Sequence, residues 1–465
     1  ARLASTGIVV GPALATTISE GRALFARYPA AAAIYLPAGR ALLEGDRLVN
    51  PDLAATLREI AAGGADAFYR GDLARRIAID MAANGGLISE ADLGDYHAIE
   101  REPLRGTYRG HTVYTASPPV AAGASLIEAL QILDHYVPPT PARYDRQADV
   151  LHYAIEAWKA REPSPRIADP AVWPVDLATL LSRAHAAARF AQIDARRAGP
   201  MPAPGEDGLP RGSEDTGRLG RGTTAFVVAD AAGNGVVVTQ TLSTWGGSFY
   251  VSDGLGFLYN NHLRGYRTSP DAYGHLRPSM RSSSTALPTL VVDERDGRRQ
   301  PRLAIAAAGN AWIPASIYGV LSAVLDGGRP VQAAIEAPRF LVARDPAGGA
   351  GRRARVQIED RFPKAVLDDL VARGHLFRKI GGKGELRYGF AAAVLFDQAR
   401  GLVHAGTEPR RPYAAAVAEP SGGRKPGPGG AAAGLNPSPV TPARPAGPAR
   451  RTARRTAAAA VAGGR

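Results

Sequence analysis

The sequence predicts an α/β fold built in layers, and three observations support this prediction. Residues 1–195 carry mainly helical patterns, residues 223–420 are rich in strand patterns, and a joint rich in Gly, Pro and charge lies between them at 196–222. Helices and strands that bury their apolar sides against one another form layered domains. With 465 residues, the chain is long enough to bury a large core.

The first part of the chain is predicted to be mostly helical. Apolar residues recur at helical spacing in the segments 53–63, 72–84, 124–136, 148–161 and 177–195. Pro51 suits the first turn of a helix, and Asp72 and Ser89 are predicted N-caps. The run 110–115 is predicted to be a short strand.

The second part begins with a hairpin pattern, in which two β-rich runs at 223–230 and 235–243 flank a turn. Pairing Asp230 with Gly235 would place Thr223 opposite Leu242, with Thr241 as its next cross-strand neighbour. The other predicted elements are strands at 256–259, 288–292 and 302–307 and helices at 313–325, 331–336 and 363–373.

The net charge is concentrated at the end of the chain. Residues 421–465 hold eight Arg and Lys, no acidic residue and almost no large apolar side chain, which predicts a disordered basic tail. The formal charge of +13 therefore leaves only +5 for the rest. A nucleic-acid or anionic-surface binder is one alternative, and its affinity would depend strongly on salt. No aromatic residue is interleaved with these charges, so we expect no specific nucleic-acid partner.

The sequence lacks the residues or motifs that several kinds of functional site require. The chain has no cysteine, which excludes disulfides, thiolate metal sites and a Cys nucleophile. Its nine His residues show no metal-ligand spacing, and phosphate-loop and dinucleotide motifs are missing, so we expect no metal and no cofactor. No run reaches the ~18 apolar residues of a membrane span, and the first residues do not read as a signal peptide.

One position indicates a chemical role. Gly222 and Thr223 stand where the joint meets the first strand of the hairpin. A Thr in this place can attack the peptide bond before it by an N-to-O acyl shift, and a small preceding residue lets the backbone bend. Cleavage would leave Thr223 with a free α-amine, so that one residue supplies both nucleophile and base. The alternative is that the two Thr residues simply begin an edge strand.

Several blocks of the sequence resemble the gamma-glutamyltransferase (gamma-glutamyltranspeptidase, glutathione hydrolase) family. Residues 45–119 resemble its large-subunit core, and TTAFVVADAAGNGVVVTQTLSTWGGSF (223–249), GLGFLYNN (254–261) and VQAAIEAPRF (331–340) resemble its small subunit. The resemblance implies a four-layer αββα N-terminal-nucleophile hydrolase fold. It also implies a precursor that cleaves itself before Thr223 into two fragments that stay together. Such an enzyme moves the gamma-glutamyl group of glutathione or a related amide onto Thr, and then to water or an amino acid.

The resemblance assigns roles to residues around the nucleophile. Thr223 matches the nucleophile, and Thr241 matches the Thr that hydrogen-bonds to it. Ser243 falls at a substrate-binding Asn and His262 at a Gln or Glu, so both are candidate substrate-binding residues. Ala225 stands where the family usually has His.

A second group of candidate residues lies further along the chain. The family's Ser-Ser pair falls within residues 282–285, which makes Ser283 and Ser284 candidates for substrate binding. The Gly-Gly pair that donates oxyanion-hole N–H groups aligns with Gly309 and Asn310, and backbone donors survive a side-chain change. Gly265 replaces the Asp that holds the substrate amine.

The resemblance leaves two alternatives to a glutathione hydrolase. Family members carry a further N-terminal segment, with buried strands and an Arg for the substrate carboxylate, that would precede residue 1 of this chain. A non-catalytic relative that keeps part of the fold is therefore one alternative. An acylase of a non-glutamyl amide is the other, because Gly265 offers no charge for a substrate amine. The family is commonly exported, which predicts a periplasmic or secreted location.

Overall fold

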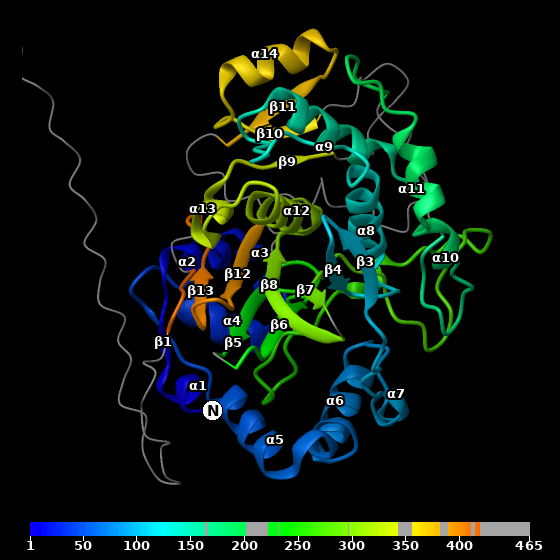
Figure 1. Cartoon of the computed structure of the whole chain (residues 1–465). Helices are drawn as coiled ribbons and strands as arrows, with labels where there is room; N and C mark the ends of the chain where they lie inside the picture. Colours follow the sequence, from blue (N-terminus) through cyan, green and yellow to red (C-terminus); the bar gives the residue numbers. More distant parts are fainter. Residues whose placement is uncertain are drawn as a thin grey trace, which may run out of the picture. The chain divides into compact units, whose positions relative to one another are not determined.

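An antiparallel sheet forms the centre of the fold in the computed structural model (Figure 1). The structure describes residues 1–162, 166–200, 222–230, 232–295, 297–342, 356–381, 389–410 and 414–418. In spatial order, the sheet consists of β13 (Leu402–Gly406), β12 (Phe390–Asp397), β8 (Arg298–Ala308), β7 (Thr289–Arg295), β4 (His111–Thr115) and β3 (Leu104–Tyr108). Strands from both parts of the sequence thus join one sheet, within the compact unit Ala1–Val417.

Helices cover one face of this sheet, and a two-stranded hairpin covers the other. The helices on the sheet are α8 (Ala121–Leu133) and α12 (Trp312–Leu325), and α9 (Ala148–Ala160) packs against α8. The hairpin consists of β5 (Thr223–Ala229) and β6 (Gly235–Thr241). Side chains alternate along β8, as expected for a strand buried on both faces. Leu303, Ile305 and Ala307 join the core under the helices, whereas Ala304 packs with the inner face of the hairpin.

The other described elements surround these layers (Figure 1). The helices are α1 (Arg2–Thr6), α2 (Pro12–Glu20), α3 (Arg22–Phe25), α4 (Pro29–Tyr35), η1 (Pro37–Gly39), α5 (Pro51–Tyr69), α6 (Asp72–Ala83), α7 (Glu90–Asp95), α10 (Leu177–Leu180), α11 (Arg183–Phe190), η3 (His262–Gly265), α13 (Val331–Glu336) and α14 (Lys364–Ala372). The strands are β1 (Ile8–Val9), β2 (Arg47–Leu48), β9 (Phe340–Leu341), β10 (Val356–Glu359) and β11 (Phe377–Ile380).

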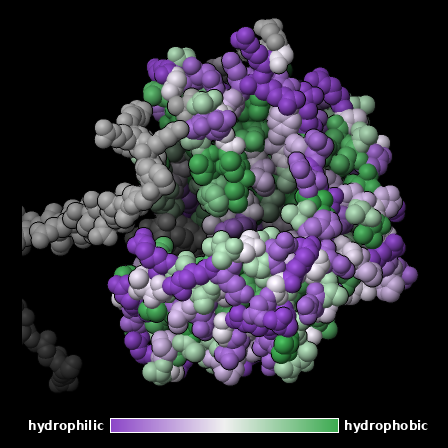
Figure 2. Space-filling view, turned by 90° about the horizontal axis from the view of Figure 1, so that it is seen from below, coloured by the Kyte–Doolittle hydropathy of each residue, from purple (hydrophilic) through white to green (hydrophobic). Residues whose placement is uncertain are grey.

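The outer face of the hairpin is apolar and open to solvent. Side chains on it include Phe226, Val228 and Val236, which are 41%, 59% and 57% exposed. Apolar groups are also visible on the face drawn in Figure 2, where they gather beside a hollow. In the described part of the chain, no helix combines the length and apolar character needed to cross a membrane.

The structure confirms most of the predicted elements and corrects four details. Thr223 pairs directly with Thr241, not with Leu242, because Asp230 lies in the turn and holds Asn234 with its side chain. The run 256–259 forms only an isolated bridge. The helix predicted at 177–195 is broken into α10 and α11, since Ser182 caps the second helix.

The fourth correction concerns helix N-caps. Gly71, not Asp72, is the N-cap of α6, whereas Ser89 caps α7 in the predicted way, within a capping box. The predicted basic tail at 421–465 and most of the joint at 196–222 lie outside the described residues.

Candidate active site

Thr223 is the first residue of β5, and its partner across the hairpin is Thr241 of β6. The Thr223 hydroxyl donates a hydrogen bond to Oγ1 of Thr241 over 3.0 Å. Both residues face inward, toward the central sheet, because inner and outer positions alternate along the two strands. The direct pairing therefore brings the predicted nucleophile and its predicted partner together.

The hydroxyl of Thr241 uses all of its hydrogen-bonding capacity. It accepts from the Thr223 hydroxyl and from the N–H of Ser243 over 2.9 Å, and it donates to the carbonyl oxygen of Gly222 over 3.2 Å. A hydroxyl has one proton and two lone pairs, so its orientation is fixed by these three bonds. Oγ1 of Thr223 is thereby linked to the carbonyl of its own peptide bond.

Gly222 stands in a place where only glycine fits. A Cβ on this residue would lie 2.2 Å from the carbonyl oxygen of Thr244 and 2.7 Å from the amide nitrogen of Trp245. Its carbonyl also accepts a hydrogen bond from the N–H of Leu242 over 3.2 Å. The close approach of two backbone segments holds the Gly222–Thr223 peptide bond beside Thr241.

Ser243 follows the hairpin in an unusual backbone conformation, with φ at +78°. A residue other than glycine in this region costs about 1–3 kcal/mol and is often found at functional sites. The turn is held by Asn261, whose backbone N–H donates to the carbonyl of Leu242 and whose side chain bonds Thr244 at two points. Sequence reasoning missed Asn261 and the Leu242 amide, although Asn261 ends the quoted block GLGFLYNN.

His262 begins η3, next to the hairpin. Burial lowers the pKa of its imidazole, and a hydrogen bond with the backbone of Thr241 opposes part of this shift. The ring is therefore neutral at pH 7, and it contacts the Ser282 hydroxyl at 3.5 Å. The structure thus places this predicted residue against Thr241, while its role in substrate binding stays a prediction.

The predicted serine pair has two different environments. The hydroxyl of Ser284 accepts a hydrogen bond from the N–H of Ala286 over 3.0 Å. The hydroxyl of Ser283 is buried and has no hydrogen-bond partner among the described residues. The Ser283 hydroxyl is thus buried and unsatisfied among the described residues, whereas Ser284 supports its own loop, and their role in substrate binding stays a prediction.

Gly309 and Asn310 connect β8 to α12 in the left-handed region, with φ values of 124° and 52°. Asn tolerates this region better than most residues, so the change from Gly to Asn is compatible with the backbone. The two residues lie where a strand of the central sheet ends and α12 begins. Their predicted role as oxyanion donors stays a prediction.

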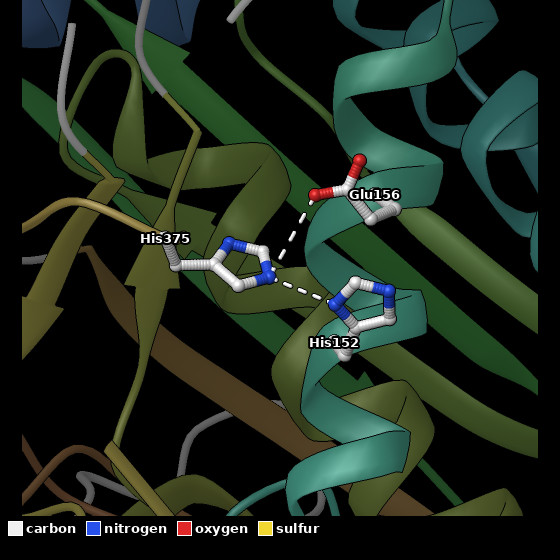
Figure 3. Close-up of side chains that lie close together, drawn as sticks. All are labelled: His152, Glu156 and His375. Atoms are coloured by element: carbon white, nitrogen blue, oxygen red, sulfur yellow. Dashed lines mark hydrogen bonds and ion pairs between the residues drawn. The ribbon is translucent and has the colours of Figure 1, made fainter. Parts of the chain in front are cut away.

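A separate buried cluster has the composition of a metal site. Potential ligand atoms of His152, Glu156 and His375 lie within 4.8 Å of one another (Figure 3). His152 Nδ1 and His375 Nε2 are 2.8 Å apart, and the second ring nitrogen of His152 lies 2.8 Å from the carbonyl of Asp194. Since a carbonyl only accepts, His152 is protonated at Nε2, and His375 then donates to Nδ1 of His152.

The charges around this cluster oppose a cation. The Lys159 ammonium donates to the Glu156 carboxylate over 2.7 Å and so neutralises it. Burial and, to a smaller extent, the positive charge of Lys159 lower the pKa of His375 to about 3. A divalent ion would meet the same repulsion as the proton. We therefore interpret the cluster as a neutral hydrogen-bonded support of helix α9.

Stacked β layers covered by helices, with a Thr at the start of a strand that packs against the central sheet, are the arrangement of the N-terminal-nucleophile hydrolases. Comparison with known proteins identifies the family within this class. The family model Gamma-glutamyltranspeptidase matches residues 1–418, and the chain belongs to this family.

Two curated relatives with different names illustrate the range of the family. The acylase ACY 1 proenzyme of Pseudomonas sp. (strain V22) is 34% identical over 375 residues, which cover 80% of this chain and 63% of the relative. The glutathione hydrolase proenzyme of Escherichia coli (strain K12) is 32% identical over 355 residues, 73% of this chain and 59% of the relative. The chain thus spans less than two thirds of the length of these relatives.

The fold is also that of a solved structure of the class. The crystal structure of cephalosporin acylase from Bacillus halodurans matches with a TM-score of 0.74 at 26% identity. The match covers 88% of this chain and 71% of that chain. The α/β fold predicted from the sequence is confirmed.

Proposed function

We propose that this chain is a self-cleaving threonine enzyme that acts on a gamma-glutamyl amide or a related amide. The observation that supports it is the hydrogen-bonded run from the Thr223 hydroxyl through Thr241 to the carbonyl of Gly222. Both curated relatives described above are named proenzymes. Cleavage between Gly222 and Thr223 would give the fragments 1–222 and 223–465.

Turnover follows from the new N-terminus. The free α-amine of Thr223 accepts the proton of the Thr223 hydroxyl, whose oxygen attacks the carbonyl carbon of the substrate amide. The leaving amine takes the proton, and an ester forms at Thr223. Water or an amino acid then attacks this ester and restores the hydroxyl. Backbone N–H groups of Gly309 and Asn310 would stabilise the negative oxygen in both steps.

The second candidate is an acylase whose acyl group carries no amine. Gly265 is the position that would distinguish the two substrates. The resemblance places there an Asp whose carboxylate holds the substrate amine, whereas glycine has no side chain to bind it. A Cβ on Gly265 would meet nothing within 4 Å, so the space for a side chain is empty. The neutral ring of His262 adds no negative charge. A relative named acylase and a solved cephalosporin acylase fit this second candidate.

Two chromogenic amides distinguish the candidates, because they differ only in the α-amine. Release of p-nitroaniline is measured from gamma-glutamyl-p-nitroanilide and from glutaryl-p-nitroanilide, with Thr223→Ala as the control. Release from either amide that Thr223→Ala abolishes supports the threonine mechanism, and equal rates in the two proteins contradict it. Preference for the glutaryl amide identifies an acylase. Gly265→Asp should then shift the preference toward the gamma-glutamyl amide by about 10-fold or more, the effect of one charged hydrogen bond.

The location of the protein is also a proposal. The resemblance implies export to the periplasm or to the medium, where a peptidase of this kind would meet glutathione or other amides. Fractionation of the source cells with antibodies to the chain tests this location. Recovery only with cytoplasmic markers would contradict it.

A further inference from the structure

The scissile carbonyl of Gly222 is contacted by two hydrogen-bond donors. The N–H of Leu242 and the hydroxyl of Thr241 each lie 3.2 Å from this oxygen. The first bond extends the hairpin ladder by one residue beyond β6, and the second comes from a side chain. Two fixed donors on the oxygen of a reacting carbonyl are the arrangement of an oxyanion hole.

We propose that the Leu242 N–H and Thr241 Oγ1 together hold the carbonyl oxygen of Gly222 during self-cleavage, and that the Leu242 N–H serves this step and not turnover. This proposal rests on the proposed function, because it concerns the step that produces the nucleophile. The predicted turnover donors, Gly309 and Asn310, lie elsewhere in the fold, in the connection between β8 and α12.

The same atoms provide a path for the proton. When Oγ1 of Thr223 bonds to the carbonyl carbon of Gly222, the π electrons of the carbonyl move to its oxygen. The proton of Thr223 passes to Oγ1 of Thr241, and the proton already on Thr241 passes to the carbonyl oxygen. The tetrahedral intermediate is therefore neutral, with the Leu242 N–H still donating to its oxygen.

The remaining steps break the peptide bond and hydrolyse the ester that replaces it. The C–N bond breaks as the intermediate's hydroxyl proton moves to the nitrogen, which leaves the α-amine of Thr223 and an ester between Gly222 and the Thr223 oxygen. Water then hydrolyses the ester to a Gly222 carboxylate and a free hydroxyl. None of these steps needs an ionisable side chain, which agrees with the presence of Ala225 opposite Thr239 in the hairpin.

The test compares two substitutions of Leu242 in the full chain. Leu242→Pro removes the N–H, whereas Leu242→Ala shortens the side chain and keeps the donor. Self-cleavage is followed as the fraction of intact chain over time, and turnover is measured per cleaved molecule. We expect Leu242→Pro to slow self-cleavage by about 100-fold or more and Leu242→Ala to have little effect. Turnover per cleaved molecule should be unchanged in both.

A second pair of variants controls for misfolding that the proline could cause. Thr241→Val removes the other donor and keeps the β-branched shape, and Thr241→Ser restores a hydroxyl. Slow cleavage in Thr241→Val that recovers in Thr241→Ser supports the proton path. Three results would overturn the proposal. They are cleavage of Leu242→Pro at the wild-type rate, cleavage of Leu242→Ala as slow as that of Leu242→Pro, and a loss of turnover in Leu242→Pro as large as its loss of cleavage. A wild-type chain that never cleaves contradicts the proposed function itself, and this proposal with it.

Discussion

Gly222→Ala is the substitution whose effect can be worked out most directly from the structure. The added Cβ would lie 2.2 Å from the carbonyl oxygen of Thr244, and real Cβ atoms essentially never come within 3.0 Å of such an atom. Because the neighbours are backbone atoms, residue 222 must move by about 0.8 Å or more. Such a shift would lengthen the two 3.2 Å bonds to its carbonyl beyond hydrogen-bonding distance.

The expected result is slow self-cleavage in a folded chain. Loss of one oxyanion donor costs about 100- to 1,000-fold in rate, so Gly222→Ala should cleave at least about 100-fold more slowly than wild type. The intact chain of 48.6 kDa and its fragments are quantified by mass spectrometry during incubation. Gly11→Ala is the matched control, because its φ is −82° and a Cβ there meets nothing within 4 Å. Wild-type cleavage kinetics in Gly222→Ala would refute the reasoning.

Three further predictions concern other residues. In the folded chain His375 stays neutral down to about pH 3, whereas in the unfolded chain it takes up a proton near pH 6.5. Acidification from pH 6.5 to pH 3 should therefore lower the free energy of unfolding by up to about 1.4 kcal/mol per pH unit. Denaturant titrations of His375→Gln, which keeps a donor but cannot titrate, should show a shallower pH dependence; an unchanged slope would contradict the lowered pKa. Elemental analysis after dialysis against zinc should find no stoichiometric metal at His152, and one tightly held zinc per chain would show that interpretation to be wrong. Ser283→Ala should leave the melting temperature nearly unchanged and raise KM, since its hydroxyl has no partner in the described structure; a large loss of stability with unchanged KM would indicate a structural role.

The predictions from sequence succeeded where the pattern is local. Apolar spacing located α8, α9 and α12, and the β-rich runs located the hairpin, because burial on one side repeats along each element. The register was off by one residue, since the side chain of Asp230 closes the turn through Asn234 and no spacing rule shows this bond. The short strands β9, β10 and β11 were missed because two to four residues are too few to show a pattern, and they gain their order from pairing with one another.

The candidate site was predicted in part. The pair Thr223 and Thr241 followed from the hairpin and from the resemblance, and the structure places their hydroxyls in contact. The two donors to the carbonyl of Gly222 could not be predicted, because a backbone N–H leaves no mark on the residue type of Leu242. The conflict that reserves position 222 for glycine also arises from a backbone segment over twenty residues away. Only the folded chain brings these atoms together.

Self-cleavage at one peptide bond is the central claim, and the mass of the purified protein tests it most directly. The wild-type chain should separate under denaturing conditions into two fragments that end at Gly222 and begin at Thr223, while Thr223→Ala should remain intact. N-terminal sequencing of the C-terminal fragment, 223–465, should begin with Thr-Thr-Ala. An intact wild-type chain of 48.6 kDa that persists on long incubation would contradict the claim and favour the non-catalytic alternative.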